Sequence, residues 1–463
     1  MYSQAVLTAL LAWPVVAAAI VLLVPERWAK HVALAASLVE FAISVPLWWT
    51  FRPAAGMQFV LDLPWIPAWG IRYTVAVDGI SLFMVLLTTF LVPLSVLGSY
   101  AYITTRERGF YALMLALTSG MIGVFVSLDL FLFYVMWEVM LIPMYFIIGV
   151  WGGERRLYAA IKFFIYTFFG SLLMLVAILA LVSLVGHQTG VYSFSYAYLT
   201  AHLGGLGPTA FWLFGAFFLA FAIKVPLFPF HTWLPDAHVE APTAGSVLLA
   251  GVLLKMGTYG FLRFALPLFP TVALHPAIQT GIVALSLIGI VYGGLVAMVQ
   301  PDFSTGALFF LAGMLYERRH SRLIDAFGGI AKVVPLLAAA LTIVSLSSIG
   351  LPATNGFVGE FLVLLGAFRT YPRAAIVAAA GVIVAAMYLL PALQRVIYNP
   401  LDKPENEKLR DLSPREIAIL VPLLACIVWI GVYPAPILRR MEPAAKNLVQ
   451  SVRLDAATFT ATR

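Results

Sequence analysis

Four ionisable side chains stand inside long apolar stretches of this sequence: Glu138, Lys224, Lys255 and Glu360. A charge at the centre of a membrane helix costs about 2.5–3.5 kcal/mol on insertion scales, so such residues are rare and are paired or hydrated where they occur. Burial favours the neutral form of acids and bases alike, which allows them to exchange protons near neutral pH. The four residues therefore predict a proton relay.

Glu138 and Lys224 carry opposite charges and are predicted to form a coupled pair inside the membrane. At ~4 Å and an effective dielectric near 20 their attraction is about 4 kcal/mol, which offsets much of the desolvation cost. A static salt bridge that only orients two helices is the alternative interpretation. Lys255 and Glu360 have no obvious structural partner in the sequence, which favours the relay.

His231 stands seven residues after Lys224. If a helix resumes beyond the intervening prolines, this spacing is about two turns and places both residues on one face. His231 is then predicted to extend the relay toward the cytoplasm; the alternative is an interfacial histidine that caps a loop. Nearby Asp236, His238 and Glu240 do not predict a metal site, because prolines and the loop context disfavour a shared helical face.

Three more charged residues stand at the ends of apolar stretches. Asp78 and Asp129 precede such stretches and are predicted to cap helix starts, where a carboxylate accepts unpaired amide hydrogens. Lys162 stands at the entry to another stretch and is either a topology residue or an influence on the charge state of Glu138.

The composition excludes a water-soluble protein. Of the 463 residues, 62% are hydrophobic and 11% are charged, against ~45–50% apolar residues in soluble domains. The single cysteine, Cys426, excludes disulfides, cysteine-ligated zinc and iron–sulfur clusters within this chain. The net charge of +7 comes from basic residues in short loops, so it indicates membrane topology and no nucleic-acid partner.

Apolar runs of about 20 residues are long enough to cross ~30 Å of hydrocarbon. They predict twelve spans, at residues 5–25, 31–51, 79–104, 109–128, 129–151, 160–186, 209–230, 241–265, 273–300, 332–369, 374–396 and 414–434. The first is predicted to be a retained membrane helix rather than a cleaved signal peptide, and the tenth is longer than one crossing needs. Loops on one side hold fifteen lysines and arginines and loops on the other side hold five, leaving the terminal tail aside. This asymmetry places both termini outside the cytoplasm.

Two spans contain residues that interrupt a helix beside a charge. In AIKVPLFPF, Pro226 and Pro229 follow Lys224, and SSIGLPATNGFVGEF leads into Glu360. Proline removes a backbone donor, so each helix should open there; packing kinks are the alternative. Paired interrupted helices are typical of inverted-repeat transporters.

The predicted fold is one all-α membrane domain with a first repeat at residues 109–265 and a second, incomplete repeat at 273–396. N-terminal helices at 1–108 precede the repeats. A cytoplasmic loop, the last helix and an external tail at 397–463 follow them.

Four long motifs carry a family resemblance: FYVMWEVMLIPMYFIIGVWGGERRLYAAIKFFIYT, FAIKVPLFPFHTWLPDAHVEAPTAGSVLLAGVLLKMGTYG, STGALFFLAGMLYERRH and LPATNGFVGEF. They closely resemble the antiporter-like membrane subunits of respiratory NADH:quinone oxidoreductase, complex I, and the resemblance covers nearly all of the chain. Two features favour the M branch of this family. Glu360 stands where the L and N branches and Mrp-type antiporters usually have lysine, and no long lateral helix follows the last span.

The resemblance implies that Glu138 and Lys224 are a coupled pair, Lys255 a central relay and Glu360 an exit-side carboxylate. It implies no cofactor or metal in this chain; NADH, FMN, iron–sulfur clusters and quinone belong to partner subunits. The implied partners are other membrane and peripheral subunits of complex I, especially neighbouring antiporter-like subunits, in a bacterial plasma membrane. An Mrp-type cation/proton antiporter subunit and a truncated, non-pumping scaffold are the alternatives.

The chain departs from the family between Asp302 and Ser304, where roughly 35–40 residues are absent, about two spans of 20. The remnant from Phe303 to about Tyr316 is too short to cross the membrane. A continuous chain predicts a re-entrant or displaced half-helix, an incomplete second repeat and a gap opposite Lys255. If Asp302 and Phe303 are not bonded neighbours, they should lie well beyond the ~3.8 Å spacing of adjacent Cα atoms.

Overall fold

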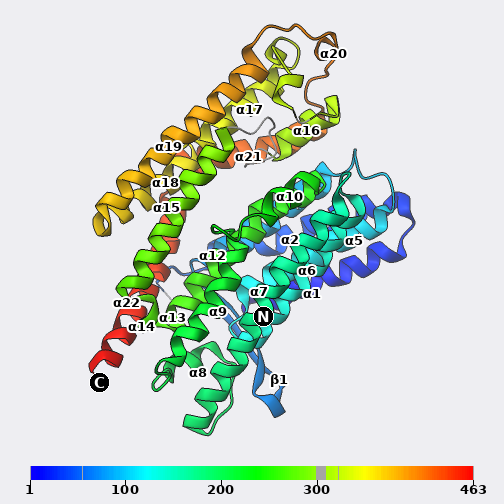
Figure 1. The fold of residues 1–463 in the computed structure, drawn as a ribbon. Helices are drawn as coiled ribbons and strands as arrows, with labels where there is room; N and C mark the ends of the chain where they lie inside the picture. The colour runs from blue at the N-terminus through cyan, green and yellow to red at the C-terminus, as the bar shows by residue number, and fades with distance from the viewer. Residues whose placement is uncertain (1, 55, 299–308, 322, 462–463) are drawn as a thin grey trace. The chain divides into compact units, whose positions relative to one another are not determined.

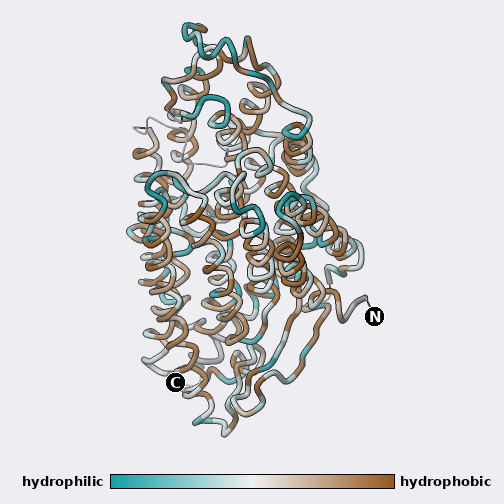
Figure 2. The backbone as a smooth tube through the Cα atoms, turned by 90° about the vertical axis from the view of Figure 1, so that its right-hand side faces the viewer, coloured by the Kyte–Doolittle hydropathy of each residue, from teal (hydrophilic) through white to brown (hydrophobic). Residues whose placement is uncertain are grey.

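The computed structural model describes residues 2–54, 56–298, 309–321 and 323–461. They form two compact units, Met1–Gln279 with Arg439–Arg463, and Thr280–Leu438. Both are built almost entirely from helices (Figure 1). The helices are predominantly apolar, whereas hydrophilic residues gather in the connections (Figure 2). The junction of Asp302 and Phe303, and with it the prediction about their spacing, lies outside the described residues.

The first unit begins with four long helices, α1 (Tyr2–Leu23), α2 (Glu26–Ser44), α4 (Ser81–Gly98) and α5 (Glu107–Val126). The short α3 (Leu47–Thr50) follows α2. α5 packs against α1, α2 and α4 and is the most enclosed of the candidate membrane spans among the described residues. A helix that is apolar on all sides is stable in such a buried position.

The next helices are α6 (Leu130–Trp151), α7 (Arg156–Thr189), α8 (Tyr196–Ala201) and α9 (Thr209–Lys224). α6 packs between α5 and α7, and α7 packs against α9. Asp129 accepts hydrogen bonds from the amides of Phe131 and Leu132 at the start of α6. Asp78 accepts hydrogen bonds from the amides of Ile80 and Ser81 at the start of α4. Both predicted helix caps are confirmed.

The first predicted helix break is confirmed at the end of α9. That helix stops at Lys224, and α10 (Trp233–Glu240) begins after a turn. The following span is α11 (Thr243–Leu248), α12 (Leu254–Gly260) and α13 (Leu266–Leu268), joined by π-helical stretches η2 (Leu249–Leu253) and η3 (Phe261–Ala265). The short α14 (Pro270–Ala273) leads out of it.

The second predicted break is confirmed in the other unit. The overlong span at 332–369 consists of α17 (Pro335–Ser348) and α18 (Asn355–Thr370). Most of α15 (Pro276–Met298) belongs to this unit. The unit also contains α16 (Phe309–Arg319), the 3-10 turns η4 (Ile324–Ala326) and η5 (Ile330–Lys332), α19 (Pro372–Leu393), the π-helical η6 (Gln394–Tyr398), α20 (Pro404–Glu407) and α21 (Pro414–Val432). α22 (Ala435–Ala461) ends the described chain.

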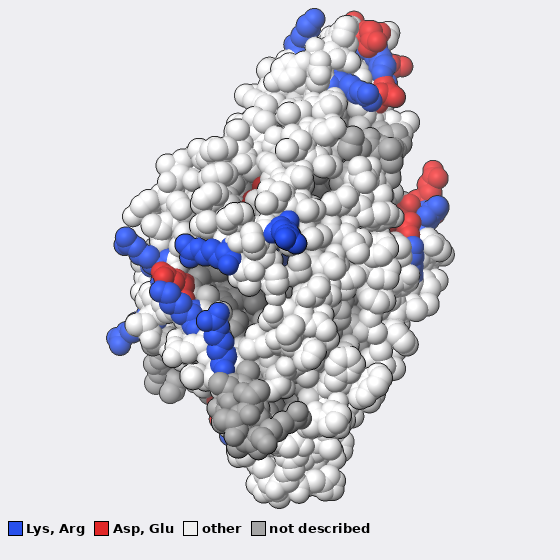
Figure 3. Space-filling model, turned by 60° about the vertical axis from the view of Figure 1, so that its left-hand side comes forward, with Lys and Arg blue, Asp and Glu red and all other residues white. Residues whose placement is uncertain are grey.

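Ten of the described helices are long and apolar enough to cross a membrane, and α9 and α17 are shorter apolar helices. Each of the twelve predicted spans has a helical counterpart, although the seventh is cut short by the first break and the tenth is divided by the second. On the face shown in Figure 3, charged side chains occur in a few groups, and other residues cover the areas between them. Such a surface suits contact with lipid.

The all-α prediction omitted one hairpin in the first unit. Strands β1 (Gln58–Ile66) and β2 (Ile71–Val77) pair antiparallel, and the 3-10 turn η1 (Pro67–Trp69) with Gly70 at φ +70° connects them. Alternating apolar and polar residues in IRYTVAV, bounded by glycine, were the available signal. Arg72 and Thr74 donate to Asp62 across the strands, and the Arg72 hydrogen bond lowers the pKa of Asp62.

Candidate functional site

Lys224 is the last residue of α9, and its side chain is only 1% exposed. Its ammonium lies over the rings of Trp137 and Phe163, 5.6 and 5.4 Å from their centroids. The thioether sulfur of Met140 is 3.7 Å from Nζ. Aromatic faces attract a desolvated cation by about 2 kcal/mol, but they neither neutralise it nor accept its proton. Lys224 is therefore held in a pocket that tolerates both its charged and neutral forms.

The break after α9 fixes the position of this ammonium. The last carbonyls of a helix lack intrahelical donors. Here the indole of Trp233, the first residue of α10, donates to the carbonyl of Ile223 at 2.9 Å. Trp233 is fully buried and packs on Phe163, which also contacts the Lys224 ammonium. The two halves of the broken helix are thus joined directly beside Lys224.

Glu138 follows Trp137 on α6, the helix that also supplies Met140. Its carboxylate lies near the Ser171 hydroxyl of α7, which donates to the carbonyl of Phe168, and it acts on Lys224 only through space. One carboxylate oxygen, Oε1, is buried and has no hydrogen-bond partner. Among the described residues no ion pair within 4.0 Å joins Glu138 to Lys224. The two side chains are therefore not in direct contact, and any influence of Glu138 on Lys224 acts through space.

Lys255 lies on α12, between the two π-helical stretches, and its side chain is exposed within the described part of the chain. Its ammonium donates to the carbonyl of Ala250 in η2. A π-helical turn leaves carbonyls available for such contacts and often marks a functional position. Lys255 also acts electrostatically on His238, a buried residue of α10. Sequence reasoning considered His238 only as a metal ligand and missed this proximity.

His231 does not lie on a helical face shared with Lys224. It occupies the turn between α9 and α10, because the helix does not re-form until Trp233. Its ring stacks on Phe228 with centroids 5.6 Å apart. The two-turn spacing argument for His231 is therefore wrong, and the position agrees with a loop histidine.

Lys162 pairs with Asp236 of α10 rather than acting directly on Glu138. The Nζ–Oδ2 distance is 2.7 Å, and Arg155 binds the other oxygen of Asp236 at 3.0 Å. The Arg155 amide donates to the side chain of Glu240, at the end of α10. This cluster ties α10 to the start of α7, and only the fold brings its members together.

We expect Asp236→Asn to loosen α10 without unfolding the unit. The ion pairs are partly exposed, so their loss should cost about 0.5–1 kcal/mol, or roughly two- to fivefold in local opening. Hydrogen–deuterium exchange of residues 233–240 in the assembled protein measures this change. Arg439→Ala, at an arginine for which no ion pair within 4.0 Å is found among the described residues, is the control; equal exchange in wild type and Asp236→Asn would contradict the expectation.

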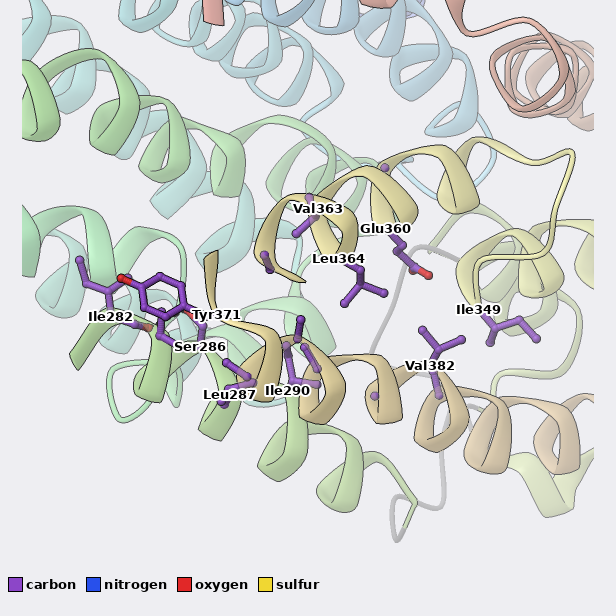
Figure 4. A pocket seen from close by; sticks show the side chains of 18 residues that line it. Ile282, Ser286, Leu287, Ile290, Ile349, Glu360, Val363, Leu364, Tyr371 and Val382 are labelled. Carbon is purple, nitrogen blue, oxygen red and sulfur yellow. Dashed lines mark hydrogen bonds between the residues drawn. The ribbon is translucent and has the colours of Figure 1, made fainter. Parts of the chain in front are cut away.

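Glu360 belongs to the other unit, where it lies on α18 beside a cavity of about 530 Å³. Figure 4 shows Glu360 and Leu364 pointing from α18 toward the side where Val382 of α19 lies. Ser286 and Tyr371 are the other side chains with polar groups in a lining that is otherwise apolar. The carboxylate also packs on Gly350, where φ is +74° and a side chain would meet Oε2. The helix break thus makes room for this carboxylate.

Two buried charged groups were missed or misplaced by sequence reasoning. Arg263, one of the five basic residues counted in the outer loops, is 7% exposed in η3 and forms an ion pair with Asp78. Glu40 is fully buried in α2, inside the predicted span at 31–51, where its charge was the overlooked signal. Within the described ranges, no group of three histidine, cysteine or acidic residues could hold a metal ion.

Comparison with known families reveals a match to a model described as "NADH:quinone oxidoreductase/Mrp antiporter, TM". It covers residues 127–305 and 302–387. The two matched segments therefore meet at residues 302–305, where the sequence analysis placed the absent stretch.

Individual relatives match over almost the full chain. NADH-quinone oxidoreductase subunit M of Rhodobacter capsulatus is 43% identical over 483 residues, covering 94% of this chain and 93% of the relative. NADH-ubiquinone oxidoreductase chain 4 of Arabidopsis thaliana is 39% identical, with 96% and 97% covered. A chain of respiratory complex I from Thermus thermophilus with bound NADH has a TM-score of 0.86 at 30% identity, covering 96% of this chain and 99% of that one.

Proposed function

This chain belongs to the subunit M family, the antiporter-like, proton-translocating membrane subunits of NADH:quinone oxidoreductase, and we propose that Lys224 is its principal proton carrier. The observation that carries the proposal is the burial of the Lys224 ammonium among Trp137, Phe163 and Met140. A buried lysine without a contacting carboxylate exists in either protonation state at modest cost, which a proton carrier requires.

Glu138 controls the state of Lys224 in this proposal. An ionised Glu138 stabilises the ammonium through space, so it favours proton uptake at Lys224. When Glu138 is neutralised, that attraction disappears and the desolvated ammonium releases its proton. The absence of a contact ion pair supports this role, because a tight salt bridge would resist the separation of charge that each cycle needs.

The released proton passes toward Lys255 and then Glu360. His238 supports the first step because it is buried, belongs to α10 beside the break, and interacts with Lys255. Glu360 supports the last step because it is the one carboxylic acid among the described residues that line its cavity. We assign His231, in the turn after α9, to proton entry from the cytoplasmic side.

The chain is a multi-pass membrane subunit of complex I, and the finer setting is part of the proposal. Electrons pass from NADH through FMN and iron–sulfur clusters to quinone in partner subunits, while this chain contacts neighbouring antiporter-like subunits. The lysine and arginine asymmetry supports both termini outside the cytoplasm in a bacterial plasma membrane. The paired breaks at α9 and α17–α18 support two inverted repeats in one membrane domain, the second incomplete.

Glu138→Gln tests the coupling. Gln keeps the size and hydrogen bonding of the side chain but cannot become negative, so Lys224 should lose its electrostatic partner. We expect the rate of NADH-driven proton pumping, measured as vesicle acidification by the assembled complex, to fall about three- to tenfold, since one lost charge interaction of roughly 1 kcal/mol shifts the rate of a transfer step by that factor. Lys255→Ala should act similarly. Glu138→Asp is the matched control, and normal pumping by Glu138→Gln would contradict the coupling.

A non-pumping scaffold remains a second candidate because of one observation. The family match is split at residues 302–305, and the alignment with the Rhodobacter capsulatus relative extends over 483 residues, more than the 463 of this chain. If the chain only completes the assembly, Lys224→Ala should leave the rates of NADH-driven proton pumping and coupled quinone reduction unchanged.

A further inference from the structure

Glu40 is a buried carboxyl group that the relay does not use. It lies on α2 with 1% of its surface exposed, on the same buried face as Ala33, Ser37 and Ser44. Neither of its oxygen atoms has a hydrogen-bond partner. A buried carboxyl group left in this way costs free energy unless a proton or water satisfies it.

Among the described residues of the helices that pack on α2, no cation is placed to balance an ionised Glu40. The described parts of α1 and α4, which pack on α2, contain no Asp, Glu, Lys, Arg or His. On α5 the charges are Glu107 and Arg108 in its first turn, and Glu107 pairs with Lys30 of α2 at 3.7 Å. Lys30 precedes Glu40 by ten residues, about 15 Å of helix.

The charges on the other side are also distant. Arg440 of α22 lies 4.1 Å from the ring centroid of Trp48. Trp48 follows Glu40 by eight residues, or about 12 Å along a helix. Arg27 and His31, the remaining basic residues of α2, lie at its start with Lys30. Burial without a counter-charge therefore favours the neutral, protonated carboxyl.

Helix register brings other unfilled polar groups to the same level. Ser44 and Thr89 share a hydrogen bond of 2.7 Å, and Tyr100 donates to the Lys30 carbonyl, so α2 and α4 run antiparallel. Glu40 lies one turn before Ser44 on α2, and Pro93 lies one turn after Thr89 on α4. Proline has no amide hydrogen, so the Thr89 carbonyl lacks its usual helical donor.

Ser95 completes this group. It lies two residues beyond Pro93, is fully buried, and its hydroxyl has no hydrogen-bond partner. Glu40 and the Thr89 carbonyl thus present at least three unfilled hydrogen-bonding positions on facing turns of α2 and α4, and the Ser95 hydroxyl adds another, six residues or about 9 Å beyond Thr89 along α4. A buried water molecule typically makes about three hydrogen bonds to such groups.

We propose that Glu40, Ser95 and the turn opened by Pro93 form a buried site that binds a proton and water. The protonated carboxyl donates to the water molecule, which donates in turn to the Thr89 carbonyl and the Ser95 hydroxyl. This site lies in the N-terminal helices and is independent of the path through Lys224. It gives the subunit a further group, outside the proposed relay, capable of storing a proton within the membrane.

Infrared spectroscopy of the whole complex in lipid tests the bound proton. A neutral carboxylic acid has a C=O stretch that shifts on exchange into D₂O, and this band should be lost in Glu40→Gln. Lys224→Ala should retain it, so the result does not depend on the proposed relay. Loss of an ionised carboxylate band instead, or no difference between wild type and Glu40→Gln, would overturn the proposal.

Ser95→Ala tests the shared water while leaving the carboxyl in place. The Glu40 band should persist but shift in frequency, because the water loses one of its partners. Hydroxyl-radical footprinting should show lower labelling of the peptide around Glu40 in Glu40→Leu than in wild type. An unshifted band with unchanged labelling would show that no water is held there. If Glu40→Gln fails to assemble, the Ser95→Ala spectrum alone decides the question.

Discussion

Replacing Lys224 by alanine is expected to reduce NADH-driven proton pumping and coupled quinone reduction by at least about tenfold, since a rise of about 1.4 kcal/mol in one transfer barrier already has that effect. NADH oxidation with an artificial acceptor should stay intact, because the proposed function assigns the electron path to other subunits. The physical reason is that Trp137, Phe163 and Met140 surround the ammonium but offer no group that could carry its proton.

Lys224→Arg separates proton transfer from a purely electrostatic role. Arginine keeps the positive charge but does not release a proton in proteins, so this variant should also fail to pump. Lys446→Ala, at an exposed lysine of α22, is the control and should pump normally. Normal pumping by Lys224→Arg would show that only the charge matters. Loss of artificial-acceptor activity in an assembled complex would contradict the division of labour between subunits.

The second large effect is expected at the buried ion pair between Arg263 and Asp78. Both side chains are less than one-tenth exposed, and Arg263 also donates to the Tyr259 hydroxyl at 3.2 Å. Removing one member of a buried pair leaves an uncompensated charge and costs about 3–5 kcal/mol. We therefore expect Arg263→Met to deplete the subunit from the assembled complex and to lower its thermal stability sharply.

The double variant Asp78→Asn with Arg263→Met should recover most of that stability, because it leaves no unpaired charge. Asparagine also preserves the helix cap that Asp78 provides to the amides of Ile80 and Ser81. The measurement is the temperature at which the subunit is lost from the purified complex, compared among wild type, both single variants and the double variant. Equal loss in the double and the Arg263→Met variants would show that the guanidinium stabilises through packing rather than charge pairing.

The sequence by itself determined the membrane setting, the helices and both breaks. Apolar length defines a span without reference to its neighbours, and proline or glycine acts on the local backbone, so α9, α17 and α18 end and begin near the predicted residues. The caps at Asp78 and Asp129 were also predictable, since a cap involves residues two or three apart. The family motifs likewise identified Lys224, Lys255, Glu138 and Glu360 as candidates.

Only the tertiary structure decided which groups meet. The aromatic enclosure of Lys224, the pairing of Lys162 with Asp236 and the ion pair of Arg263 with Asp78 join residues from different helices, and helical periodicity carries no information on such partners. The prediction for His231 failed for a different reason. The spacing argument assumed a continuous helix after Lys224, whereas the chain forms a turn there. Glu40 was overlooked within its apolar run, and its isolation is visible only in the packing of the uncharged helices α1 and α4 against α2.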